Sequence, residues 1–510
     1  MTLQQTRPDI ARWADEIAEV ARAAGLDFFE TIFEVVDFNT LQQIAAYGGF
    51  PQRYPHWRFG MEYDRLRKQH VYGLGKIYEM VINNDPCYAY LVNDNSDVDQ
   101  KLVITHVYAH CDFFKNNQWF CKTNRKMMDE MANHATRVRR HMDRFGHDVV
   151  ERFLDTCVSL DNLIDPQTVF MQKANQRQPA SQVSDERDIE KEIVRYKSKR
   201  YMESWINPPK DAHRQREALL AKRAKEKKAL PERPLRDVLR FLLNYAPLDD
   251  WEADILSIVR EEAYYYAPQA QTKIMNEGWA TFWHSRLMTT RILSDDELIT
   301  YADHHSGTVA AQPGQMNPYK IGVELFRDIE DRWNRGRFGR EYEECSSMEE
   351  GRKWDKKLGL GMEKIFEVRR IYNDVTFIDE FLTPEFVDRF KLYHYRYDPT
   401  TRRMVVVNRD YEKIKAQMLF MLANHAQPYI YVVDGNYANR GELYMAHRHN
   451  GVDLDIKYAV ETLKRVEQVW RRPVHLQAMI NDEMVLFSFD GQQSQQQKVH
   501  GDLPEPAHTV

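Results

Sequence analysis

Two histidines stand four residues apart in the segment ITHVYAHCDFFKNN, residues 104–117. On a helix, residues i and i+4 lie one above the other, so His106 and His110 can present their imidazoles to one ion. A hydrolytic zinc takes three protein ligands and leaves its fourth position to water. The pair therefore indicates part of a metal site, unless both histidines only pack inside a helix, which is the alternative for an isolated HxxxH pair.

The third ligand is predicted from MNEGWATFWH, residues 275–284. Glu277 is a carboxylate among apolar and aromatic residues, where a charge without a partner would cost several kcal/mol. His284 follows seven residues later and shares its helix face. We predict that His106, His110 and Glu277 hold Zn2+ or another divalent metal, with His284 as a fourth ligand or next to the ligands. An iron site that also uses Glu79 is an alternative.

Two short motifs are similar to those of zincin aminopeptidases, in which H-E-x-x-H is followed by N-E-G-x-A on a later helix. The segments HVYAH and NEGWA have these spacings, but Val107 stands where those enzymes carry the glutamate that acts as general base. Another base is therefore required. We assign this role to Glu79, an isolated acid in IYEMVINNDPCYAYL, ahead of Asp112, which points elsewhere on the helix.

Two further side chains are predicted to polarise a substrate carbonyl. They are His305, in DHHSGT, and Tyr319, in MNPY. For these two residues, as for Glu79, a purely structural role is the alternative.

The whole chain has 510 residues, which exceeds what one hydrophobic core normally serves. Its 71 basic and 77 acidic residues give a net charge of −6, so there is no overall basic field for nucleic acid. Five cysteines without CxxC pairs indicate reduced thiols. No apolar run reaches the length of a membrane span, and the N-terminal segment lacks the apolar region of a signal peptide. We expect a soluble cytoplasmic protein.

The periodicity predicts an α+β protein with a large, mainly helical domain. This domain comprises residues 1–172 and 237–398, with helices near 10–25 and 144–163, one ended by Pro268, and one at 272–290. Its zincin-like paired helices would carry the site. Residues 173–236 are dominated by charged residues and glutamine and predict an exposed helical insertion, or else a docking surface for an acidic partner.

After residue 400 the period changes to that of strands. The order is βαββαβ with one extra strand, which predicts a small ferredoxin-like domain at 399–490. Residues 491–510 are polar and are expected to form a disordered tail.

Five motifs occur in this order: YPHWRFG (54–60), YEMVINNDPCYAYL (78–91), HVYAHCDFFKNN (106–117), MNEGWATFWH (275–284) and NPY (317–319). With them the chain resembles the SpoVR family, stage V sporulation protein R, over residues 10–480. The resemblance implies a role in spore cortex formation, or in starvation and stress in bacteria without spores. It also implies two partners, a PrkA-type serine kinase and a protein with a von Willebrand A-like domain.

Two functional hypotheses follow. The first is a metal-dependent hydrolase of amide or peptide bonds. The second is a non-enzymatic partner of the kinase and the von Willebrand A-like protein, in which the histidines serve packing; Val107 and the charged insertion favour it.

Overall fold

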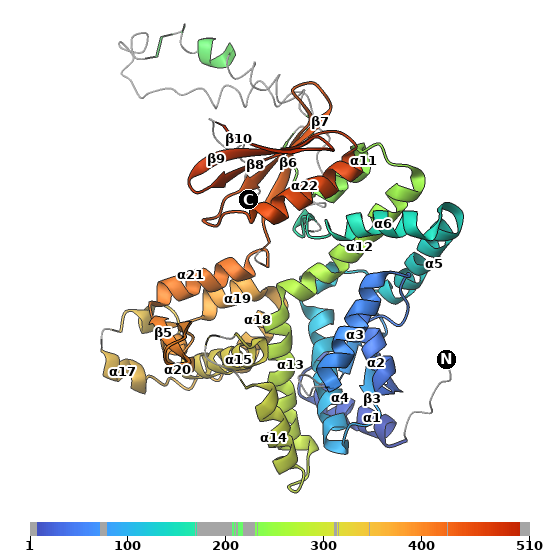
Figure 1. Cartoon of the computed structure of the whole chain (residues 1–510). Coiled ribbons are helices and arrows are strands. Elements are labelled where there is room, and N and C mark those ends of the chain that lie inside the picture. Colours follow the sequence, from blue (N-terminus) through green and yellow to red (C-terminus); the bar gives the residue numbers. More distant parts are fainter. Residues whose placement is uncertain are drawn as a thin grey trace. The chain divides into compact units, whose positions relative to one another are not determined.

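The computed structural model describes residues 8–71, 79–168, 170, 207–208, 210, 213–217, 230–231, 233–310, 314, 316–345, 347–425 and 427–499. The chain divides into two compact units, one formed by Met1–Val150 with Tyr264–Ala426 and the other by Glu151–Ala263 with Gln427–Val510. Figure 1 colours both along the sequence. The predicted α+β class is confirmed, and among the helices of the described residues none combines the length and hydropathy that a bilayer crossing needs.

The first unit contains a small three-stranded sheet near its N-terminus. Its strand order is β1 (Thr31–Val36), β3 (Cys87–Val92) and β2 (Glu79–Ile82), with β1 parallel and β2 antiparallel to β3. The strand β3 is almost wholly buried, as expected for an apolar strand in the middle of a sheet. Around this sheet come α1 (Pro8–Ala23), α2 (Phe38–Ala46), α3 (Trp57–Val71), η1 (Phe120–Lys122) and α5 (Met127–Phe145).

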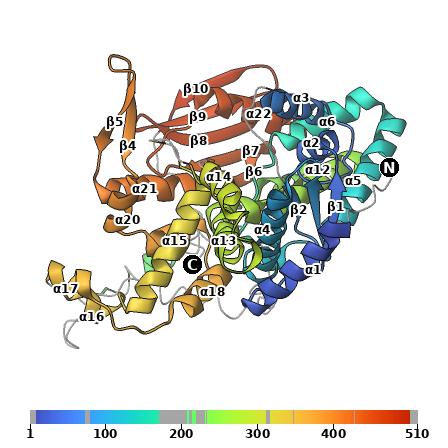
Figure 2. The same cartoon turned by 90° about the horizontal axis from the view of Figure 1, so that it is seen from below.

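Three helices form the centre of the first unit: α4 (Asp97–Asn116), α13 (Lys273–Leu287) and α15 (Pro318–Arg335). Figure 2 shows α13 between the other two. Most residues of α4 and nearly all of α13 are buried, so these helices lack the polar face of a surface helix. Ser96 caps the start of α4 by accepting a hydrogen bond from the backbone N–H of Asp99.

The crossing of α13 and α15 depends on two glycines. A Cβ atom added to Gly278 would lie 2.4 Å from Cα of Gly322, and one added to Gly322 would lie 2.2 Å from the carbonyl oxygen of Ile274. Only residues without a side chain allow two helix backbones to approach this closely. The glycine next to Glu277 therefore fixes how near α15 comes to the predicted ligand.

The start of α13 is held by a carboxylate from a distant part of the chain. Asp374, which is buried, accepts hydrogen bonds from the backbone N–H groups of Ile274 (2.8 Å) and Met275 (2.9 Å). These donors have no partner within the helix, and the helix dipole favours an acceptor there. Asp374 thus fixes the first turn of α13, on which Glu277 lies.

The remaining elements of the first unit follow α13. They are η2 (Met288–Ile292), α14 (Leu298–Thr308), α16 (Arg340–Glu343), α17 (Met348–Lys353), α18 (Gly361–Ile371), α19 (Asp374–Phe381), α20 (Pro384–Phe390), β4 (His394–Asp398), β5 (Arg403–Asn408) and α21 (Tyr411–Leu422). The strands β4 and β5 form an antiparallel pair by themselves.

The second unit contains a five-stranded sheet. Its order is β10 (Ser494–Lys498), β9 (Glu483–Phe489), β8 (Val474–Ile480), β7 (Glu442–Arg448) and β6 (Tyr429–Tyr437), with only the β7–β8 pair parallel. The helix α22 (Ile456–Trp470) joins β7 to β8, as a parallel connection requires, and packs against β8 and β9. Residue 235 adds a single bridge to β6, ahead of α11 (Val238–Tyr245). Two of the sequence boundaries between the units fall within helices, one in α6 (His147–Val158) and one in α12 (Asp250–Gln271).

Three sequence predictions need correction. The strand β5 and helix α21, assigned to the first half of a ferredoxin-like βαββαβ domain at 399–490, belong to the first unit, because β5 pairs with β4. Pro268 does not end α12, which continues to Gln271; one proline near a helix end removes a single hydrogen bond.

The predicted disordered tail at 491–510 begins instead with β10, which pairs with the edge of β9 after a turn at Gly491. Residues 500–510 lie outside the described residues, as does most of the predicted insertion at 173–236.

Candidate metal site

Three predicted ligands meet in the interior of the first unit. One ligand atom from each of His106, His110 and Glu277 lies within 4.8 Å of the other two, and all three residues are buried. The histidines come from consecutive turns of α4 and the glutamate from α13. The i, i+4 spacing and the packing of these two helices are together what bring the group about.

The distances within the group suit a metal ion. Oε2 of Glu277 lies 3.5 Å from Nε2 of His106 and 3.5 Å from Nε2 of His110. A tetrahedral zinc with bonds of about 2.0–2.1 Å separates its ligand atoms by about 3.3–3.4 Å. The same Oε2 atom is buried without a hydrogen-bond partner among the described residues. A buried carboxylate oxygen without a hydrogen bond is costly, and a cation between these three atoms would remove that cost.

The other carboxylate oxygen of Glu277 has a different partner. Nζ of Lys273 donates a hydrogen bond to Oε1 at 2.5 Å, and the lysine side chain is 56% exposed. Burial acts to raise the pKa of Glu277, but that pKa lies well below its usual range, and the ammonium group of Lys273 is among the causes. Glu277 is thus an anion with one oxygen directed at the histidines.

Each histidine of the group has a second contact that orients its ring. Nδ1 of His110 lies 2.9 Å from Oδ1 of Asn276, which can only accept a hydrogen bond. His110 therefore carries its proton on Nδ1 and directs the lone pair of Nε2 toward Glu277. This arrangement, in which the distal nitrogen donates to an oxygen, is typical of metal-bound histidine.

His106 continues into a chain of imidazoles. Its Nδ1 lies 2.8 Å from Nδ1 of His284, and Nε2 of His284 lies 3.1 Å from Nδ1 of His305. Burial, followed by the neighbouring His106 and His305, lowers the pKa of His284 well below its usual value, so this ring is neutral. A neutral His284 can accept from His106 and donate to His305.

The predicted residues occupy different places relative to this group. His284 contacts the far side of His106 and does not belong to the three-residue group. His305, on α14, is half-buried behind His284, and burial lowers its pKa. The ring of Tyr319 stacks on that of His106, with 6.3 Å between centroids. Glu79 begins β2 opposite Leu91, but its side chain lies outside the described residues, so its role as base stays a prediction.

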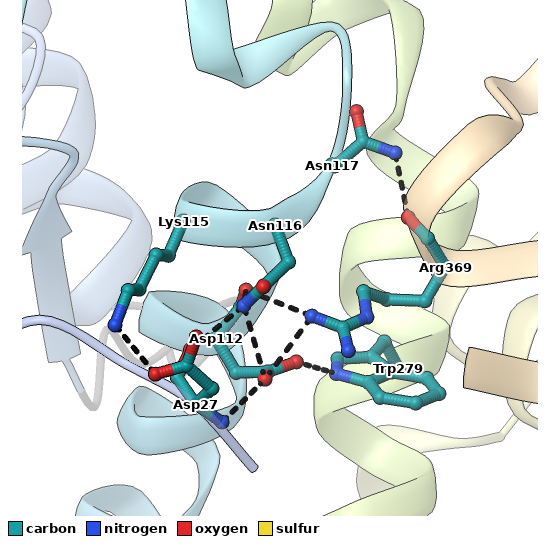
Figure 3. Close-up of polar contacts among 7 residues, drawn as sticks. All are labelled: Asp27, Asp112, Lys115, Asn116, Asn117, Trp279 and Arg369. Carbon is teal, nitrogen blue, oxygen red and sulfur yellow. Dashed lines mark hydrogen bonds and ion pairs between the residues drawn. The ribbon is translucent and has the colours of Figure 1, made fainter. Parts of the chain in front are cut away.

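Asp112, the weaker candidate base, has structural partners instead. Its carboxylate accepts hydrogen bonds from Nε1 of Trp279 at 2.8 Å and from the backbone N–H of Asp27 at 2.8 Å, and it forms an ion pair with Arg369 at 3.2 Å (Figure 3). Burial raises the pKa of Asp112 to about 6, while Arg369 opposes that rise. This network joins α4, α13 and α18, the first two of which also carry the candidate ligands.

Sequence reasoning missed the residues that orient the site. Asn276, the first residue of NEGWA, is one of them, since it precedes Glu277 directly and its amide oxygen lies 2.9 Å from Nδ1 of His110. A signal was present, since the motif of the zincin aminopeptidases includes this asparagine. Asp374 and Trp279 had no signal, because their partners are distant in sequence.

Comparison with known proteins identifies the family. Residues 4–427 match a family model described as SpoVR like protein, and residues 428–481 match one described as SpoVR-like C-terminal domain. A protein of Escherichia coli (strain K12), called uncharacterized protein YcgB, is 29% identical over 501 residues, which cover 92% of this chain and 91% of that protein. No solved structure matches. The resemblance found in the aromatic motifs is thereby confirmed, and the chain belongs to the SpoVR family.

Proposed function

We propose that this protein is a metal-dependent hydrolase of amide or peptide bonds, with His106, His110 and Glu277 as ligands of a divalent metal such as zinc. The observation that carries the proposal is the buried Oε2 of Glu277, which has no hydrogen-bond partner among the described residues and faces two Nε2 atoms at 3.5 Å. Two imidazoles and one carboxylate form a ligand set of hydrolytic zinc sites, which leave one position for water. A metal in that site lowers the pKa of its water and polarises a bound carbonyl group.

The surrounding residues suit such a site. Asn276 and His284 orient the two ligand rings from behind, as carboxylates and carbonyls do for zinc-bound histidines. The chain from His106 through His284 to His305 gives protons a path away from the group. We assign Tyr319, whose ring stacks on His106, to the orientation of a substrate carbonyl, and Glu79 to the general base.

The proposal compares the paired helices α4 and α13 with those of zincins. One residue differs from the zincin motif. Val107, at the place of the zincin glutamate, is fully buried in the hydrophobic core and has an apolar side chain, so it cannot act as the general base. This observation favours a second function, in which the protein is a non-enzymatic partner of a PrkA-type serine kinase and a von Willebrand A-like protein in sporulation or stress. In that case the metal would be structural or absent.

Metal analysis tests the first proposal. Protein purified from zinc-supplemented medium should contain close to one divalent metal per chain, and iron in its place would support the iron alternative. The variants His106→Ala, His110→Ala and Glu277→Gln should each lose the metal. The matched control is His447→Ala, since His447 is buried but belongs to the second unit, whereas the three candidate ligands belong to the first. A full-length folded protein without metal, or variants that keep it, would refute the assignment.

A further inference from the structure

A second feature of the first unit is a cavity of about 710 Å³. It is lined by the start of α15, by α20 and the residues after it, by the β4–β5 pair and by α21, which Figure 2 shows gathered at one side of α13. His106, His110 and Glu277 are not among its lining residues. The volume falls within the roughly 300–1,000 Å³ of small-molecule sites. The cavity is therefore large enough for a ligand and separate from the candidate metal group.

The walls of the cavity are mostly apolar. Phe386, Ile414 and Met418 are buried and line it, whereas Met316 and Met421 line it with exposed side chains. Methionine side chains are flexible and adapt to ligands of irregular shape. Apolar surface that continues from a cavity to the solvent marks a binding site more often than a stable free surface.

The charged side chains that line the cavity are all cationic. They are Lys320, Lys391 and Arg396, and the described lining includes no aspartate or glutamate. Within the part of the chain that the structure describes, neither lysine nor Arg396 has a carboxylate within ion-pair distance. Lys415 of α21 differs in this respect, since it pairs with Asp379 at 3.0 Å. Cations that remain without a partner beside an apolar cavity attract an anionic group.

We propose that this cavity binds a single-chain amphipathic anion, namely a free fatty acid. Its aliphatic chain would lie against Phe386, Ile414 and Met418, and its carboxylate would meet Lys320, Lys391 and Arg396 at the rim. One chain suits a cavity of this size, whereas a bilayer surface would need a flat apolar face. The proposal does not depend on metal at His106, His110 and Glu277.

Titration calorimetry with laurate, below its critical micelle concentration, tests the proposal on the full-length protein. Dodecanol and dodecyltrimethylammonium have the same chain with a neutral and a positive head group. We expect laurate to bind at one site, to bind at least about tenfold more tightly than either analogue, and to weaken as salt is added. Equal affinity for the three compounds, or no binding of laurate, would overturn the proposal.

Variants separate the head-group contacts from the chain contacts. Lys320→Gln/Lys391→Gln/Arg396→Gln should abolish the preference for laurate over dodecanol, and Met418→Trp should fill the cavity and reduce the binding of both. Lys413→Gln is the control, because Lys413 lies on α21 but pairs with Asp410 outside the cavity. Unchanged laurate affinity in the triple variant, or binding to anionic vesicles without binding of monomeric laurate, would refute the fatty acid site. Metal content should not change in any variant, so failure here is distinct from failure of the metal site.

Discussion

Oε2 of Glu277 lies 3.5 Å from Nε2 of His110, and no hydrogen bond joins the two residues through that oxygen. Both atoms are buried, and each is a strong metal ligand in its unprotonated form. The separation is close to the edge of a zinc tetrahedron, about 3.3–3.4 Å. The predictions below concern the helices that maintain this distance.

The variant Glu277→Gln distinguishes between two possible roles of Glu277, that of a metal ligand and that of a purely structural carboxylate. The variant keeps the size of the side chain but removes the charge that helps to balance a divalent ion, so metal affinity should fall by orders of magnitude. The metal-free variant should unfold at a temperature close to that of the metal-free parent, because the buried charge no longer requires a partner. Thermal unfolding with and without chelator measures both effects.

The control for Glu277→Gln is Glu330→Gln on α15, which removes a carboxylate that pairs with Arg286 away from the group. It should leave metal content unchanged. A destabilisation of Glu277→Gln that persists in chelator, together with normal metal content, would end the ligand assignment.

Gly278→Ala tests the close crossing of α13 and α15. The new Cβ would lie 2.4 Å from Cα and 2.5 Å from the carbonyl carbon of Gly322, so the backbones must separate. Overpacking of this kind costs roughly 1–3 kcal/mol of unfolding free energy, and the shift of α13 should also weaken metal binding. Urea unfolding and metal titration provide the measurements.

Gly60→Ala serves as the matched control, because a Cβ there meets nothing within 4 Å on the exposed helix α3. It should leave stability unchanged or raise it by up to about 1 kcal/mol. If Gly278→Ala proved as harmless as this control, the glycine contact would have no role in placing Glu277.

Arg369→Met removes the cation that faces Asp112 in a buried ion pair. The carboxylate would remain fully buried without its counter-ion, which costs about 3–5 kcal/mol. Adding Asp112→Asn should restore much of that loss, since the amide oxygen can still accept from Trp279. Urea unfolding of the two single variants and the double variant gives the coupling energy.

The neighbouring residue supplies the control for the ion pair. Arg370 is exposed, so Arg370→Met should change stability by less than about 0.5 kcal/mol. Additive losses in the double variant would show that Asp112 and Arg369 do not stabilise each other.

Asp374→Asn should change how stability depends on pH. Burial raises the pKa of Asp374 to about 7 from an ordinary value of 3.8, although hydrogen bonds from Ile274 and Met275 oppose the rise. Between these two values the folded state binds a proton that the unfolded state has lost, so this group makes stability fall as pH rises from about 4 to 7. The variant should lack that component of the slope.

Melting temperatures of the parent and of Asp374→Asn at intervals from pH 5 to pH 8 measure the difference. At the low end the asparagine should be less stable by roughly 1–3 kcal/mol, because one amide oxygen replaces two acceptors. Parallel curves over this range would contradict the shifted pKa.

The grouping of His106, His110 and Glu277 could be predicted from the sequence more readily than the residues around it. The HxxxH spacing sets the direction of both histidines on any helix, and an acid in an apolar helix such as Glu277 must find a partner, so local physics was sufficient. The packing of α4 against α13 was inferred only through the zincin motifs. Asp374 and Arg369 were not found, because their contacts with α13 and α4 depend on tertiary structure and leave no periodic signal.

The fold shows the same division between local and long-range information. Strand β5 and helix α21 were recognised from their periodicity, but strand pairing is not encoded in the pattern of one strand, and β5 pairs with β4 and not with the larger sheet. For β10 the polar composition was misleading, because an edge strand needs backbone hydrogen bonds more than apolar side chains.

The two helices that supply the candidate ligands are made at different times. Asn276, which contacts His110 and precedes Glu277, is 166 residues later in the chain. At roughly 5–20 residues per second, a ribosome needs on the order of 10 s or more to synthesise that interval. During this time the growing chain carries the histidine pair without its carboxylate, so a complete three-ligand site, and any choice among the metals of the cell, arises only after α13 has left the ribosome and packed against α4.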